Sequence, residues 1–91
     1  SMFRRNIDLK IEGEEVRLSI RLHEFIVDEH HLKKSDFPQF VGKVPNKWVG
    51  EKVSVKKIGV SSFLRIECGE VKRIYLLPEH EIISLCQEMR S

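Results

Sequence analysis

Apolar and polar residues alternate one by one along much of this chain, and this period of two limits its fold more than any other feature. Ile7, Leu9 and Ile11 alternate with polar residues, and a turn-like segment, Glu12–Glu15, follows. The alternation then resumes, with its apolar residues at Val16, Leu18, Ile20 and Leu22. Successive side chains of a strand point to opposite faces, so each run predicts a half-buried strand. Together the two runs predict an antiparallel hairpin with one apolar face.

A second hairpin is predicted further along the chain, with a defined register. Its first strand alternates apolar and other residues over Phe63–Cys68, and Gly69-Glu70 follows. Glycine at the first place of a two-residue loop is typical of a type II′ turn. Such a loop sets Cys68 opposite Val71 and Glu67 opposite Lys72. The returning strand, residues 71–77, is apolar on both faces near its end, so another element should cover it.

The segments between the two hairpins give weaker signals. Phe25–Val27 either prolongs the second strand or starts a third, and residues 28–31 should end it. Residues 33–38 predict a loop, and residues 40–44 a short extended run. Pro45–Gly50 predicts one helical turn, because proline suits an early helical position and glycine suits the exit. Val53, Val55 and Ile58 then predict another strand.

The last segment, residues 78–90, predicts a helix. Ile82, Leu85, Cys86 and Met89 recur with the spacing of one helical face, and Arg90 closes the segment. Pro78 begins it, and the first turn carries two glutamates, which the helix dipole favours there. The apolar stripe would pack on the protein's own sheet or dock into the groove of a partner.

These elements predict an α+β fold that is mainly β, with five or six antiparallel strands and one C-terminal amphipathic helix. The strands would form an open sheet or curl into a partly open barrel. The chain has 91 residues, so we expect residues 1–91 to form a single small domain, with Ser1 left over from expression. Homodimerisation would cover apolar surface that so small a core leaves exposed.

Composition excludes several classes of protein. No apolar run approaches the ~20 residues that cross a bilayer, and the first residues lack the apolar stretch of a signal peptide. We therefore expect a cytoplasmic protein without a membrane partner. The two cysteines, Cys68 and Cys86, are too few for a disulfide framework. Buried free thiols in a reducing compartment are the simplest interpretation, with one bridge or a metal role as alternatives.

No residue pattern indicates catalysis, so we expect neither an enzyme nor a cofactor. His30 and His31 follow two acids, but neighbouring side chains on an extended backbone point to opposite faces and could not grip one metal ion easily. Ser61-Ser62 lacks the glycines of a nucleophile elbow. Cys86 lies on the apolar helical stripe, where burial would raise its pKa.

The charge of the chain is unevenly distributed. Residues 8–31 carry seven acids and three bases, whereas residues 33–57 carry seven lysines and two acids. This basic middle segment predicts either a positive patch for an anionic partner or simply a solvated face. The candidate nucleic-acid-binding residues are Lys43, Lys47, Trp48, Lys52, Lys56 and Lys57, which Arg17 and Arg21 on the second strand would extend. The lysines would contact phosphates while the indole stacks on a base, or Trp48 would instead anchor the core or a dimer interface.

The same segment resembles a known family. Over residues 33–58 the matching residues are Lys34-Ser35, Val44-Pro45, Lys47-Trp48-Val49-Gly50 and Lys52-Val53 with Val55. They resemble short archaeal transposon-encoded proteins related to the AbrB/MazE group of swapped-hairpin regulators. The resemblance implies a strand, a turn of helix that begins at proline, and a second strand. It also implies two interlocked chains that present basic loops to DNA.

The sequence thus favours a small non-catalytic binding module that binds nucleic acid with low sequence specificity, because lysines contact phosphates as point charges. The alternative is a protein-interaction or accessory domain that binds no nucleic acid. Its contact would be a sheet edge or an aromatic patch around Phe37, Phe40 and Trp48.

Overall fold

The computed structural model describes residues 5–90, so the prediction for Ser1 lies outside the described residues. The chain divides between Lys33 and Lys34 into two compact units, each with its own sheet. Within residues 5–90 no helix has the length and apolarity that crossing a bilayer requires.

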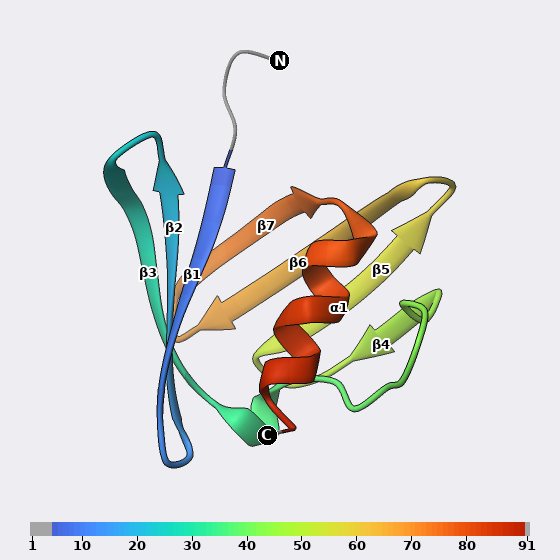
Figure 1. The fold of residues 1–91 in the computed structure, drawn as a ribbon, viewed down its shortest axis with the longest axis horizontal. Coiled ribbons are helices and arrows are strands. Elements are labelled where there is room, and N and C mark those ends of the chain that lie inside the picture. The colour runs from blue at the N-terminus through green and yellow to red at the C-terminus, as the bar shows by residue number, and fades with distance from the viewer. Residues whose placement is uncertain (1–4, 91) are drawn as a thin grey trace. The chain divides into compact units, whose positions relative to one another are not determined.

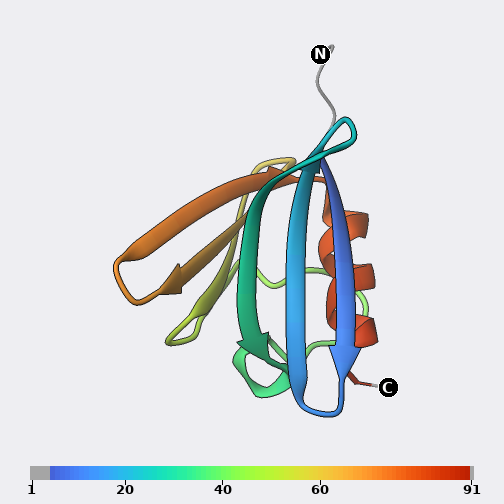
Figure 2. The same ribbon diagram turned by 90° about the vertical axis from the view of Figure 1, so that its left-hand side faces the viewer.

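The first unit is a three-stranded antiparallel sheet in the order β1-β2-β3. Its strands are β1 (Arg5–Glu12), β2 (Glu15–Leu22) and β3 (Phe25–Lys33), which Figure 2 shows side by side in blue to green. Ile11 pairs with Val16 across the first turn, which confirms the predicted hairpin. Phe25–Val27 starts a third strand that continues through residues 28–31, so the predicted break there is wrong.

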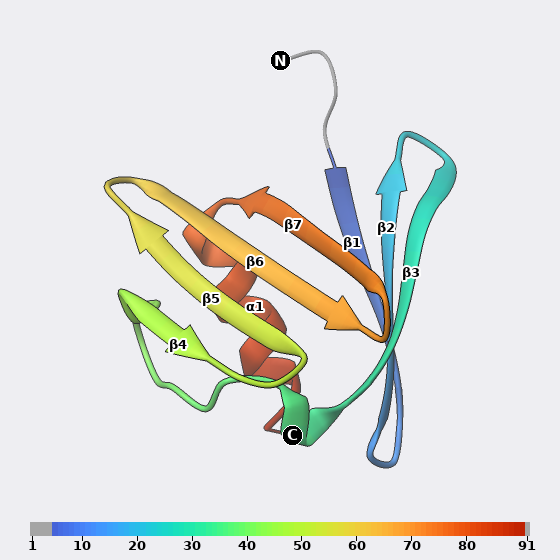
Figure 3. The ribbon, with the colours of Figure 1, turned by 180° about the vertical axis from the view of Figure 1, so that it is seen from behind.

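The second unit begins with a short 3-10 turn, η1 (Lys34–Asp36), and contains a four-stranded antiparallel sheet in the order β4-β5-β6-β7. Its strands are β4 (Lys47–Val49), β5 (Val53–Ile58), β6 (Ser61–Cys68) and β7 (Val71–Leu77). The helix α1 (Glu79–Glu88) follows and lies against one face of this sheet (Figures 1 and 3).

The predicted class, mainly β with a C-terminal helix, is confirmed, but three details are wrong. The described residues hold seven strands, not five or six, in two antiparallel sheets, and neither sheet is a closed barrel. The predicted helical turn at Pro45–Gly50 is strand β4, because Lys47, Trp48 and Val49 pair with β5. Gly50, predicted to end that turn, has no positive φ, the conformation for which glycine is favoured at a helix end. Residues 40–44 form no strand.

The core of the second unit lies between α1 and the sheet. The predicted helical stripe is confirmed, since Ile82, Leu85, Cys86 and Met89 are all buried, and the helix packs on the protein's own sheet. The sheet contributes the buried side chains of Val53, Val55, Leu64, Ile66, Tyr75 and Leu77. Both cysteines are free, Cys68 half-buried and Cys86 buried. Burial raises the pKa of the Cys86 thiol to about 11, so it is not a thiolate near neutral pH.

Candidate nucleic-acid interface

The face of the β4–β7 sheet opposite α1 carries the side chains of a candidate site. The register places alternate residues of neighbouring strands on the same face. Lys47 lies opposite Lys56, Val49 opposite Ser54, and Arg65 opposite Ile74. We call this surface the open face and define it by Lys47, Val49, Ser54, Lys56, Ile58, Phe63, Arg65, Ile74 and Leu76.

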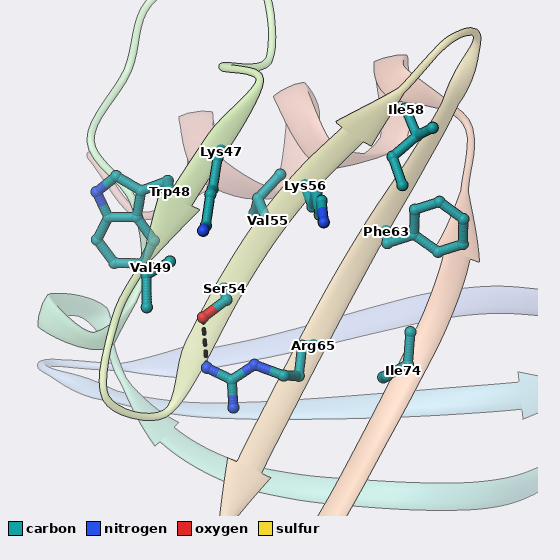
Figure 4. Close-up of a pocket in the computed structure, with 10 residues that line it drawn as sticks. All are labelled: Lys47, Trp48, Val49, Ser54, Val55, Lys56, Ile58, Phe63, Arg65 and Ile74. Carbon is teal, nitrogen blue, oxygen red and sulfur yellow. Dashed lines mark hydrogen bonds between the residues drawn. The ribbon is translucent and has the colours of Figure 1, made fainter.

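A groove of about 390 Å³ runs over the open face (Figure 4). All four strands contribute to it, and the predicted residues Lys47, Trp48 and Lys56 all line it. The aliphatic side chains Val49, Ile58, Ile74 and Leu76 of the open face are 56–65% exposed. Exposed apolar side chains gathered in this way are typical of interaction surfaces and ligand-binding grooves.

Lys47 and Lys56 form a cross-strand pair of equal charge at this groove. Both side chains are exposed, and none of the ion pairs in the described part of the chain includes either of them. Like charges directly opposite on a sheet destabilise it. An anion bound between the two ammonium groups would relieve that repulsion.

Arg65 is also cationic, but its guanidinium is already occupied. It donates to the hydroxyl of Ser54, donates to the carbonyl oxygen of Gly50 at 3.3 Å, and forms an ion pair with Glu67. Figure 4 shows its bond to Ser54 across β5 and β6. Arg65 therefore has a structural role in holding β5, β6 and the β4–β5 connection together. The positive charge of the groove that has no acidic partner among residues 5–90 belongs to Lys47 and Lys56.

Trp48 lies at the margin of the groove. It pairs with Val55, and Figure 4 shows its indole on the outer side of β4, away from Phe63. A Cβ placed on Gly50 would lie 2.7 Å from Cζ3 and Cη2 of the Trp48 ring. The half-buried indole thus rests against the backbone at Gly50, and it does not stand beside the lysines as a free stacking surface.

Lys57, predicted to join the patch, lies on the other face of the sheet. Its ammonium group donates to Oε2 of Glu79 on α1 at 3.1 Å, and the same oxygen accepts from the Val44 amide at 3.1 Å. These two bonds, the one from Lys57 foremost, hold the pKa of Glu79 below its ordinary value. Lys57 is therefore a structural cation that ties β5 to the helix.

The remaining predicted residues do not line the groove. Lys43 lies in the exposed loop before β4, where its charge also lowers the pKa of Glu79. Lys52 lies in the β4–β5 connection, where its carbonyl oxygen accepts from the Glu67 amide at 2.7 Å. Arg17 and Arg21 belong to the first unit, and Arg21 forms an ion pair with Asp8. Within the second unit, Lys43 and Lys52 thus lie outside the groove that Lys47 and Lys56 line, whereas the extension of the patch by Arg17 and Arg21 stays a prediction.

Of the three residues of the alternative aromatic patch, Phe37 is buried and so cannot contribute to a surface, whereas Phe40 and Trp48 are half-buried. The aromatic residue of the open face is Phe63, half-buried in the groove between Ile58 and Ile74 in Figure 4. Sequence reasoning missed it, although the alternation of Phe63 with the buried Leu64 was a usable signal.

The two neighbouring histidines lie apart, as their extended backbone predicts. His30 is buried, whereas His31 is exposed and its Nε2 lies 3.4 Å from a carboxylate oxygen of Glu29. No group of three or more potential ligands that could hold a metal ion occurs within residues 5–90.

No protein-family model, curated protein or solved structure matches this chain. The resemblance of residues 33–58 to the AbrB/MazE group therefore stays a prediction from those residues. The structure adds that the part of this segment from residue 47 onward is the β4–β5 hairpin.

Proposed function

We propose that the protein is a non-catalytic binding module whose open face binds nucleic acid with low sequence specificity. The observation that carries the proposal is the pairing of Lys47 with Lys56 at the mouth of an apolar groove, with no acidic partner within the described residues. Two ammonium groups on neighbouring strands repel each other, and an anion held between them offsets that repulsion. A phosphate backbone supplies that anion.

The apolar part of the groove suits a ligand that is more than an inorganic anion. Phe63 and the aliphatic side chains beside it present a surface for flat, apolar groups. A nucleotide combines an anionic phosphate with such a group, its base. Low sequence specificity follows from the lysines, because an ammonium contacts phosphate without reading a base edge.

Binding of a fluorescently labelled oligonucleotide, followed by anisotropy at several salt concentrations, tests the proposal. Two phosphate contacts predict a slope of roughly −1.4 for log K against log salt with a single strand, and about −1.8 with a duplex. Lys47→Ala and Lys56→Ala should each weaken binding about fivefold at low salt, since one contact between charges is worth ~1 kcal/mol in water.

Lys10→Ala serves as the matched control. Lys10 is also an exposed lysine, but it belongs to the first unit and forms an ion pair with Glu12. The proposal requires that this variant bind like the wild type. No binding at low salt, or equal losses in all three variants, would contradict it.

A second candidate function is favoured by the exposed aliphatic side chains of the open face. In this alternative the protein is a protein-interaction module and the open face is covered by a second copy of the chain. Self-association, measured by light scattering across protein concentration, would then persist in high salt. It would be lost in Leu76→Ser, and no nucleic acid would bind.

A further inference from the structure

We infer that the ligand of the open face is an unpaired nucleic-acid strand, with a base stacked on Phe63, and not a duplex. This inference rests on the proposed function and names the class of nucleic acid that the same groove would take. Two features of the groove carry it: the small number of unpaired cations and the apolar floor beside them.

The cations of the groove are too few to hold a duplex firmly. A protein that binds a duplex through the phosphate backbone of the DNA neutralises several phosphates, about six to ten. In this groove Arg65 is bound to Ser54, Gly50 and Glu67, which leaves Lys47 and Lys56 for phosphates. Two such contacts give a duplex little affinity and give a single strand an anchor for its backbone.

The apolar floor of the groove can bind nucleic-acid bases whose flat faces are exposed. In a duplex the flat faces of the bases are stacked on each other and cannot reach a protein surface. In a single strand they are available, and proteins bind them by stacking them on aromatic side chains. Phe63 is half-buried in the groove, with Ile58 and Ile74 beside it (Figure 4). The ring therefore has the fixed, partly exposed position that stacking requires.

The hydrogen bonds between polar groups of the groove also favour binding that does not depend on the base sequence of the strand. The Ser54 hydroxyl and the Arg65 guanidinium already bond each other. Neither is free to form the paired hydrogen bonds that distinguish one base from another. Stacking on a phenyl ring accepts any base, because every base has a flat face.

Three oligonucleotides of about 15 nucleotides separate the possibilities: a single strand of thymidines, a duplex, and a single strand of the same sugar and phosphate units without bases. We expect the thymidine strand to bind at least tenfold more tightly than the duplex at low salt. Removing the bases should weaken binding roughly 5- to 150-fold, the range for one stacked base.

Substitutions at Phe63 identify the stacking surface. Phe63→Leu should weaken binding of the thymidine strand about fivefold or more and leave its salt dependence unchanged, whereas Phe63→Trp keeps a ring and should retain binding. The base-free strand provides an independent readout on the wild-type protein if a variant fails to fold.

The outcomes separate failure of this inference from failure of the proposed function. Equal binding of duplex and single strand, or equal binding with and without bases, would overturn the unpaired strand while leaving nucleic-acid binding in place. Absence of binding by all three oligonucleotides at low salt would overturn the proposed function itself.

Discussion

At the scale of single residues, Gly50 permits the position of Trp48. Its own amide donates to the Val53 carbonyl oxygen at 2.9 Å, and that oxygen lies 2.6 Å from where a Cβ would stand. Two carbons of the Trp48 ring lie 2.7 Å from the same Cβ position. A side chain at this position would therefore displace both the turn and the indole.

Gly50→Ala should consequently destabilise the protein by about 1–3 kcal/mol through overpacking. Trp48 is the single tryptophan of the chain, so its fluorescence reports the displacement directly. We expect a lower urea midpoint and a red-shifted emission. Gly69→Ala is the control, because its Cβ would meet nothing within 4 Å and its cost comes from the φ of 62° alone, roughly 1 kcal/mol. Unchanged emission in Gly50→Ala would contradict the packing described.

Two serines on the central strands of the second unit differ in the partners of their hydroxyl groups. Ser62 is fully buried, and its Oγ has no hydrogen-bond partner among the described residues. Ser54 is also buried, but its Oγ accepts from Arg65. A buried hydroxyl without a partner costs about 1–3 kcal/mol of stability, whereas a satisfied one contributes about 1 kcal/mol.

Ser62→Ala is therefore expected to leave the free energy of unfolding unchanged or raise it by about 1 kcal/mol. Ser54→Ala should lower it by a similar amount, because the Arg65 guanidinium loses an acceptor. Chemical denaturation of both variants checks the pair. A clear loss of stability in Ser62→Ala would show that its hydroxyl has a partner that the structure does not contain.

At the scale of elements, the Glu79 carboxylate joins α1, β5 and the loop before β4 through Lys57 and Val44. Its pKa is lower in the folded state than in the unfolded chain, where it is about 4.3. The carboxylate therefore stabilises the fold fully above that pH. Its contribution is lost as pH falls through the lower, folded pKa.

Glu79→Gln should thus reduce stability at neutral pH and flatten the loss of stability on acidification below about pH 4.3. Thermal unfolding at a series of pH values measures both effects. Glu70→Gln, in the exposed β6–β7 loop, changes the charge equally and should match the wild type. An acid transition unaltered by Glu79→Gln would contradict the assigned role.

The elements that local sequence determines were predicted well. Gly69-Glu70 connects β6 and β7 in the predicted register, with Glu67 opposite Lys72. Glycine there supplies the positive φ that a two-residue loop needs at its first position. Strand β4 was mistaken for a helical turn because its state depends on β5, a partner that no local signal in Pro45–Gly50 reveals.

At the scale of the whole molecule, Lys47 and Lys56 were predicted to lie on one surface, but the sequence could not show that Lys57 lies on the other face of the sheet. Lys56 and Lys57 are adjacent, so a strand must send them to opposite faces. Because α1 covers the face of the sheet that carries Lys57, Lys57 binds Glu79 on that helix. Lys56 lies on the opposite face and lines the groove. The division between Lys33 and Lys34 likewise falls where no linker composition marks it.

Nuclear magnetic resonance of the amide groups during titration with the oligothymidine locates the ligand-binding surface without any substitution. If the open face binds the strand, signals shift there, at Lys47, Lys56 and Phe63 above all, and revert when salt is added. Shifts confined to α1 or to β1–β3, or no shifts at low salt, would contradict binding at the open face.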